Sequence, residues 1–446
     1  MISISCLRLS FLLGIPAVMS ACTEGSTASD FDRHSARLRC DVVQLVTEYA
    51  DRSHDEFFTC IDDPVRLELD PEFEREHWDL LVSGRATIDI DRSPAMIAGG
   101  APLESSEITI DESSYFRSDP DPAMLGEASV LVVRIETPDA THPLSEAELS
   151  ADVFGGPDDL INLKSQIDQC SHGKRTIEPA EVPGPHRGVM TVAVDLMAAD
   201  HDSRELANAA AGLAKTQLGL DEGVESTFDH VMYCVPPGSK TPFLAWAYSN
   251  HSRTVYNDHW CSVPVVQAHE VGHNMGLGHT GRDDEKYADT TGNMGYASNH
   301  EEGANKCFNA ARSSLLGWYA DKEVTIEAGT SGEYELVGAV DYPRASERQQ
   351  VLLKIVAPDG NRVLHVAYNV GKGPNEGTDD TREHVTVVEQ LLPVGQPSSR
   401  LAALTEDSEP FVDSAQSVTI EVLERTREQE IDAALVRVTY ADEMSD

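Results

Sequence analysis

The segment that most constrains what this chain can fold into is 269–279, which reads HEVGHNMGLGH. On a helix, His269 and His273 lie one turn apart on the same face, so both imidazoles can reach one metal ion while Glu270 points beside it. A structural zinc normally takes four protein ligands, whereas this pattern offers three histidines and leaves a position for water. The spacing therefore predicts a catalytic zinc site with His269, His273 and His279 as ligands.

Glycines make the third ligand geometrically reasonable. Gly276 comes where the helix has to stop, and a residue without Cβ can adopt the positive φ that turns His279 back towards the metal. Glu270 is then placed to accept a proton from a water molecule as that water attacks a carbonyl carbon. The alternative interpretation, a helix with surface histidines, accounts for neither the glycine nor the third histidine.

A methionine-containing turn, GNMGY at 292–296, follows the histidines. Together with HExxHxxGxxH, this turn makes the chain resemble the metzincin clan of zinc endopeptidases, in which the methionine, here Met294, forms an apolar floor under the metal. Flanking motifs narrow the resemblance to the gametolysin family over roughly residues 126–322; they are AWAY (245–248), YNDHWC (256–261), CFNA (307–310) and LGWY (316–319). The founding members have glutamine at the position of His269. Those founding members are extracellular algal proteases acting on cell-wall glycoproteins, and the family has bacterial relatives, but the resemblance transfers no particular substrate.

Tyr296 stands two residues after Met294. A tyrosine at this position is also seen in the astacin and serralysin groups, where it lies near the zinc. The resemblance therefore implies a phenol that stabilises the developing oxyanion. The alternative is a ring that only packs under the turn.

The charge balance excludes some partners. The chain has 76 acidic and 34 basic residues among its 446, for a formal net charge of −42, so its surface repels nucleic acid and anionic membranes. The acidic residues are spread along the chain, which is typical of a strongly solvated surface. A local group in 282–286, with Asp289 beyond it, has oxygen ligands that suit Ca²⁺; the alternative is a solvated acidic loop.

The N-terminus predicts export. A short apolar run at 11–18 follows Arg8 and ends in MSAC at 19–22. Such a run is too short to span a bilayer and is typical of a signal peptide. Small residues before Cys22 resemble a bacterial lipobox, in which Cys22 carries lipid; the alternative is an ordinary secretory signal. The mature protein is therefore expected at the cell envelope, lipid-anchored or secreted, and it touches the membrane only through this anchor.

The cysteines agree with export. Apart from Cys6 and Cys22, six remain, an even number that suggests disulfides in an exported protein. Cys40 and Cys60 form the natural local pair, and the other four allow three connectivities. A rival interpretation makes Cys40 or Cys60 a thiolate that caps the zinc of a latent precursor.

The strand and helix patterns predict an α+β chain in four parts. A signal peptide (1–21) is followed by a tether and small β-rich region that is a candidate propeptide (22–125). Residues 126–322 alternate strands and helices, as in a metzincin-like domain with a mixed twisted sheet. Residues 323–446 carry evenly spaced strands that predict an antiparallel β-sandwich. The pattern predicts no oligomeric state.

These observations predict an exported zinc metalloendopeptidase that hydrolyses peptide bonds of extracellular proteins or glycoproteins. The alternative is a zinc-binding adhesin or binding lipoprotein without turnover, which Glu270 argues against because zinc binding alone does not require it. A further alternative is a precursor kept inactive by residues 30–125.

Overall fold

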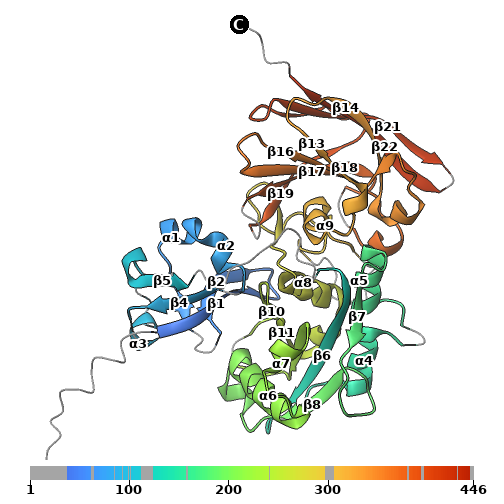
Figure 1. Cartoon of the computed structure of the whole chain (residues 1–446). Coiled ribbons are helices and arrows are strands. Elements are labelled where there is room, and N and C mark those ends of the chain that lie inside the picture. The colour runs from blue at the N-terminus through green and yellow to red at the C-terminus, as the bar shows by residue number, and fades with distance from the viewer. Residues whose placement is uncertain are drawn as a thin grey trace, which may run out of the picture.

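The structure is a computed structural model that describes residues 38–441, apart from 62–64, 85, 93, 99, 101, 112–123, 157–158, 241, 297–305, 379–380, 393–395 and 429. The described residues form an N-terminal region (38–111), a central region (124–322) and a C-terminal region (323–441). Figure 1 shows helix α8 (Pro264–Asn274) at the place where the three regions meet.

A mixed sheet organises the central region. Strand β6 pairs in parallel with β7, β8 and β9, β9 pairs in parallel with β11, and β10 runs antiparallel to β11. The strands are β6 (Gly126–Glu136), β7 (Arg175–Pro179), β8 (Val189–Ala193), β9 (His230–Val235), β10 (Ala245–Tyr248) and β11 (Arg253–Asn257). Within the central region, β10 is therefore the last strand on its side of the sheet.

Helices cover both faces of this sheet because its strands are apolar on both sides. Along β6, Val130 and Val132 pack into one core, while Leu131 and Val133 pack into another. The first core includes residues of α4 (Glu146–Phe154), α5 (Leu163–Ser171) and α8; the second includes residues of α6 (Ser203–Leu218) and α7 (Val224–Thr227). Asp202 and Glu205 form a capping box at the start of α6.

The N-terminal region builds its own core and also extends the central sheet. Strand β1 (Leu38–Glu48) pairs through its first half with β4 (Ala86–Ile90) and through its last residues with β10, so the two regions share one sheet. Trp78, Leu81 and Ile88 are among the buried residues of the N-terminal core. The remaining elements are β2 (His54–Cys60), β3 (Arg66–Leu67), α1 (Pro71–Glu76), α2 (Trp78–Leu81), α3 (Pro94–Ile97) and β5 (Ile108–Asp111).

The C-terminal region contains two sheets that share a core, as a sandwich requires. One sheet has the order β12-β19-β18-β17-β16-β13 and the other β15-β14-β22-β21-β20. The strands are β12 (Thr280–Arg282), β13 (Glu323–Ile326), β14 (Gly332–Val337), β15 (Gln349–Gln350), β16 (Leu352–Val356), β17 (Arg362–Asn369), β18 (His384–Leu391), β19 (Ser398–Leu404), β20 (Phe411–Asp413), β21 (Val418–Glu428) and β22 (Ile431–Tyr440).

The sandwich differs from the expected purely antiparallel one. Its central pairs are antiparallel, but β13 runs parallel to β16, β15 parallel to β14, and β12 parallel to β19. Strand β12 belongs to the segment directly after His279, so the central region supplies an edge strand to the C-terminal sheet. Helix α9 (Ala310–Leu316) contacts β17 and β18 of the same sheet.

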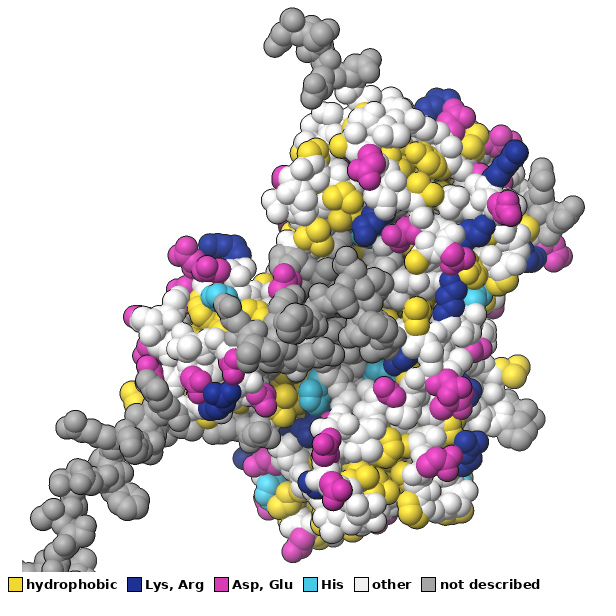
Figure 2. All heavy atoms as spheres, viewed as in Figure 1, with side chains coloured by type: hydrophobic (Ala, Val, Ile, Leu, Met, Phe, Trp, Pro, Cys, Tyr) yellow, Lys and Arg dark blue, Asp and Glu magenta, His cyan; other side chains and the backbone are white. Residues whose placement is uncertain are grey.

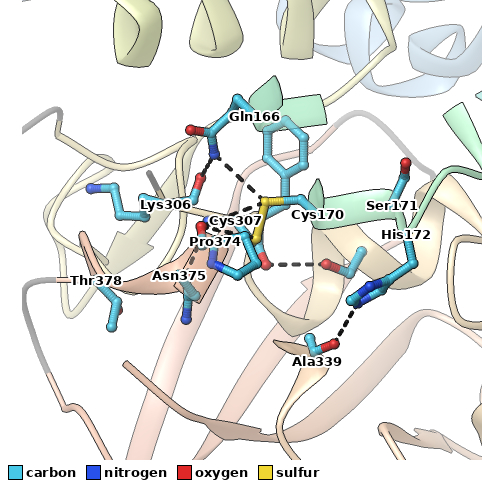
Figure 3. The surroundings of a disulfide bond; sticks show 12 residues. Gln166, Cys170, Ser171, His172, Lys306, Cys307, Ala339, Pro374, Asn375 and Thr378 are labelled. Carbon is cyan, nitrogen blue, oxygen red and sulfur yellow. Dashed lines mark hydrogen bonds between the residues drawn. A yellow bond between two sulfur atoms is a disulfide. The ribbon is translucent and has the colours of Figure 1, made fainter. Parts of the chain in front are cut away.

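Three disulfides join the six cysteines of the described residues. The predicted Cys40–Cys60 bond is confirmed, and the other four pair as Cys170–Cys307 and Cys234–Cys261. Figure 3 shows that Cys170–Cys307 ties α5 to the segment before α9, where the Asn375 side chain accepts a hydrogen bond from the Cys307 amide at 3.0 Å. This bond therefore lies where the central and C-terminal regions touch.

Acidic side chains are scattered over the face shown in Figure 2 and do not gather in one patch. This distribution agrees with the acidic residues being spread along the sequence. Among the described helices, none is long and apolar enough to cross a membrane.

Candidate metal site

Helix α8 carries the first two predicted ligands. It begins with Pro264, whose fixed φ suits a first helical position, and ends at Asn274. His269 and His273 are both buried, with ring centroids 4.9 Å apart. After the helix, Gly276 has a φ of +77°, as the sequence predicts, and the chain turns so that His279 lies 4.6 Å from His273 and 5.4 Å from His269, centroid to centroid.

The Nδ1 atoms of the three rings have partners that set their orientation. His269 Nδ1 lies 2.7 Å from the Asn293 carbonyl oxygen, and His273 Nδ1 lies 2.8 Å from that of Leu277. Both partners are acceptors, so each Nδ1 donates and each Nε2 keeps its lone pair. His279 Nδ1 lies 2.6 Å from a Glu56 carboxylate oxygen. Partners of this kind orient imidazole ligands at metal sites and raise their basicity.

The Nε2 atoms converge with a carboxylate that the sequence did not suggest. Ligand atoms of Glu48, His269, His273 and His279 all lie within 4.8 Å of one another, the only such group among the described residues. Glu48 Oε1 is 2.6 Å from His269 Nε2 and 3.5 Å from His279 Nε2. Glu48 Oε1 and the three Nε2 atoms are buried without a well-directed hydrogen bond. Buried polar atoms need partners, and a divalent metal would satisfy all four.

Glu270 is fully buried beside this cluster, and neither of its carboxylate oxygens has a hydrogen-bond partner. Burial raises the pKa of Glu270 well above its usual value, and the negative charge of Glu48 raises it further. A metal dication in the cluster would oppose that shift. An unpaired buried carboxylate destabilises the folded state, so a purely structural role explains Glu270 poorly.

The environment also favours neutral imidazole at His273. Burial lowers the pKa of His273 well below its usual value, and the neighbouring His279 and His269 add to that effect. Burial raises the pKa of Glu48, but the nearby His269 and His279 outweigh it and hold that pKa well below its usual value. The environment thus favours a neutral nitrogen donor at His273 and an ionised oxygen donor at Glu48, and zinc accepts both kinds of ligand.

Met294 lies under the helix. It is fully buried, and a Cβ built on Gly272 of α8 would stand 2.5 Å from the Met294 sulfur. The thioether therefore packs directly against the helix backbone between the two ligands of α8. Only a glycine at position 272 allows that approach.

Two tyrosines flank the cluster. Tyr287, which the sequence analysis missed, has its ring 3.8 Å from that of His279, and its buried hydroxyl has no partner. Tyr296 stacks on Tyr287 at 5.2 Å, and its hydroxyl donates to the Arg52 carbonyl oxygen at 3.1 Å. Tyr296 therefore lies beside the site, but its hydroxyl is bonded to the N-terminal region.

The other predicted sites have different outcomes. Asp289, proposed with 282–286 for calcium, is fully buried, and its carboxylate accepts hydrogen bonds from Thr291 and Asn309, whereas Asp283 is exposed; calcium binding there stays a prediction. The thiolate cap by Cys40 or Cys60 is wrong, because these two sulfurs are bonded to each other. Cys22, the lipidation candidate, lies outside the described residues.

A buried three-histidine cluster with an adjacent glutamate, on a helix that packs under a twisted sheet, defines a metal-dependent hydrolase site. The sequence profile of the gametolysin peptidase M11 family matches residues 129–366, more than half of the chain. The chain belongs to this family of metallopeptidases.

Other comparisons add little. No curated protein matches the sequence. Among solved structures, the crystal structure of wild-type OgpA from Akkermansia muciniphila is similar at 13% identity and a TM-score of 0.31, covering 70% of this chain and 91% of that one. A likeness this weak says nothing further about the fold.

Proposed function

We propose that this chain is an exported zinc endopeptidase that hydrolyses peptide bonds of extracellular proteins or glycoproteins. The observation that carries the proposal is the fully buried, unpartnered Glu270 beside three histidines whose Nε2 atoms converge. Zinc bound by His269, His273 and His279 would polarise a carbonyl group and make water more acidic.

The chain's own residues supply the proton transfers. Glu270 accepts a proton from the attacking water at a carboxylate oxygen and returns it to the amine that leaves. Burial and the absence of other hydrogen-bond partners keep this carboxylate available for that proton. Tyr296 supports the oxyanion once its hydroxyl is released from the Arg52 carbonyl.

Export rests on the sequence. The apolar run at 11–18 and Cys22 favour a signal peptide followed by a lipid anchor at the bacterial cell envelope. The disulfides agree with an oxidising compartment.

The test uses the zinc-loaded full chain and a heat-denatured protein substrate. Because strand β1 lies against the site, the assay is run before and after limited trypsin treatment followed by a trypsin inhibitor. We expect chelator-sensitive cleavage, and we expect Glu270→Gln to lower it by about 10²–10⁴-fold while keeping about one metal ion per chain. Glu68→Gln, a change in an exposed carboxylate that pairs with Arg66, is the control.

Cleavage that persists in chelator, or substantial turnover in Glu270→Gln, would contradict the mechanism. A zinc-loaded wild-type chain that cleaves nothing in either state would favour the alternative of a binding protein without turnover.

A further inference from the structure

The last strand of the central sheet is already paired. Residues 45–48 of β1 run antiparallel to residues 248–245 of β10, so that Leu45 faces Tyr248 and Glu48 faces Ala245. The pairing continues at both ends, where Ser249 N donates to Gln44 O at 3.0 Å and Leu244 N donates to Glu48 O at 2.8 Å. An exposed strand edge can bind an extended peptide by adding a strand, so β1 occupies the place that such a peptide would take.

This pairing also delivers a metal ligand. Glu48 is the last residue of β1, and its side chain, 18% exposed, reaches the three histidines with Oε1 2.6 Å from His269 Nε2. Three imidazole nitrogens and one carboxylate oxygen make four donor atoms. Four protein ligands are typical of a closed structural zinc site, whereas a catalytic site keeps one position open.

Further contacts hold the N-terminal region against the site. Glu56 of β2 binds His279 Nδ1 at 2.6 Å, and the Arg52 carbonyl, between β1 and β2, accepts the Tyr296 hydroxyl at 3.1 Å. Asn250, after β10, donates from Nδ2 to the Val82 carbonyl at 2.7 Å. The N-terminal region therefore contacts the third ligand, the tyrosine beside the site and the turn near α8.

No disulfide of the described residues links the N-terminal region to the rest. Cys40–Cys60 lies entirely within it, and Cys170–Cys307 and Cys234–Cys261 lie entirely outside it. The region is fixed internally by a covalent bond but held to its neighbours by hydrogen bonds, packing and the chain itself. It can therefore be displaced as a unit without reduction.

We propose that Glu48 is a fourth metal ligand and that residues 38–111 form an inhibitory module, with Glu48 closing the metal site and β1 covering the edge of β10. The inhibitory part rests on the proposed peptidase function, whereas ligation by Glu48 does not. The full chain is then a latent form, and activity requires that the module be displaced.

The test uses the full chain loaded with Co²⁺, whose visible spectrum reports on its ligands, and acetohydroxamate, a small bidentate chelator that needs open coordination positions. The variants are Glu48→Ala, Glu48→Gln and the control Glu68→Ala, which removes an exposed carboxylate of the same region. We expect both Glu48 variants to change the spectrum, to bind acetohydroxamate at least tenfold more tightly than wild type, and to lose Co²⁺ at least tenfold more readily to a competing chelator. Glu68→Ala should match wild type in all three.

Wild-type chain that binds acetohydroxamate as tightly as Glu48→Ala, or a spectrum unchanged in both Glu48 variants, would overturn the assignment. Glu48→Gln keeps nearly the same shape, so it decides the question if Glu48→Ala fails to fold. Untreated wild type that cleaves protein as fast as the trypsin-treated form would refute latency and leave the peptidase function standing. Open coordination in the Glu48 variants without cleavage by any form would refute the peptidase function and leave the ligand assignment standing.

Discussion

Gly276→Ala should lower both the free energy of unfolding and the affinity for metal. Gly276 forms the turn that places His279 at the metal site, and the structure leaves no room for a side chain at this position. Its φ is +77°, a conformation that costs an alanine about 1–2 kcal/mol. A Cβ there would stand 2.3 Å from Asn250 Oδ1 and 3.0 Å from both Cγ and Nδ2 of that amide. The whole amide must therefore move, which breaks its bond to the Val82 carbonyl and costs about 0.5–1.5 kcal/mol.

Together these effects predict a loss of about 1.5–3.5 kcal/mol, or a fall in Tm of roughly 2–4 °C for a chain of 446 residues. The matched control is Gly219→Ala, where φ is +65° and nothing lies within 4 Å of the added Cβ. Only the backbone cost applies there, so we expect a loss of about 1–2 kcal/mol and unchanged metal affinity. Gly276→Ala should lower zinc affinity at least tenfold, because Leu277, which holds His273, and His279 both follow the altered turn.

The assays are differential scanning calorimetry and zinc competition with a chromophoric chelator. Adding Asn250→Gly removes the clashing amide and should recover zinc affinity in the Gly276→Ala background. Equal Tm losses in the Gly276 and Gly219 variants, with zinc affinity unchanged in both, would refute this account of the turn.

Three further predictions concern other parts of the chain. Tyr296→Phe should lower turnover of the trypsin-treated enzyme by roughly tenfold to a thousandfold with little change in KM or zinc content; wild-type turnover would show that the ring only packs. Burial and the charge of Arg175 lower the pKa of His230 to about 4. The difference from the ordinary pKa of about 6.5 stabilises the folded state above pH 6.5, and this stabilisation is lost as the pH falls towards 4. That loss is about 2–3 kcal/mol, and His230→Gln should reduce the difference between urea unfolding free energies at pH 7 and pH 4.5; an unchanged difference would contradict it. If Cys22 is lipidated, mass spectrometry should find a lipid-modified N-terminus at that residue, and Cys22→Ala should be released or unprocessed; an unmodified start elsewhere would refute the anchor.

The parts of the fold that follow local patterns were predictable. Helix α6 begins at the capping box that the sequence displays, and β6 corresponds to the apolar run at 129–135. Strand β19 has a weak local signal because it begins with two serines and carries Arg400, a charged residue that is buried in an ion pair with Asp289. The connectivity of Cys170 and Cys307, 137 residues apart, depends on tertiary contacts that no local pattern encodes.

The same distinction holds at the metal site. The histidines and Glu270 are visible in the sequence because one helix and one turn fix their spacing. Glu56 lies 223 residues from the histidine it binds, and both Glu48 and Glu56 come from strands of another region, so no motif connects them to the site. Tyr287 could have been suspected from its position between His279 and the methionine turn. The sequence also assigns no edge to the central sheet, because Val255 and Tyr256 are too few residues to mark one, and the pairing places them in β11, inside the sheet.

The chain directly after the third histidine is β12, an edge strand of the C-terminal sandwich. The His279 carbonyl accepts hydrogen bonds from the Ser398 amide at 3.0 Å and from the Arg312 guanidinium at 2.7 Å. Ser398 belongs to the C-terminal region, so the backbone of one ligand is held in part from outside the central region. The sandwich is thus part of the wall of the metal site and not an appendage joined by a tether. A protein with independent domains can exchange one of them for another module. In this peptidase, replacing the C-terminal region would also change the position of a metal ligand.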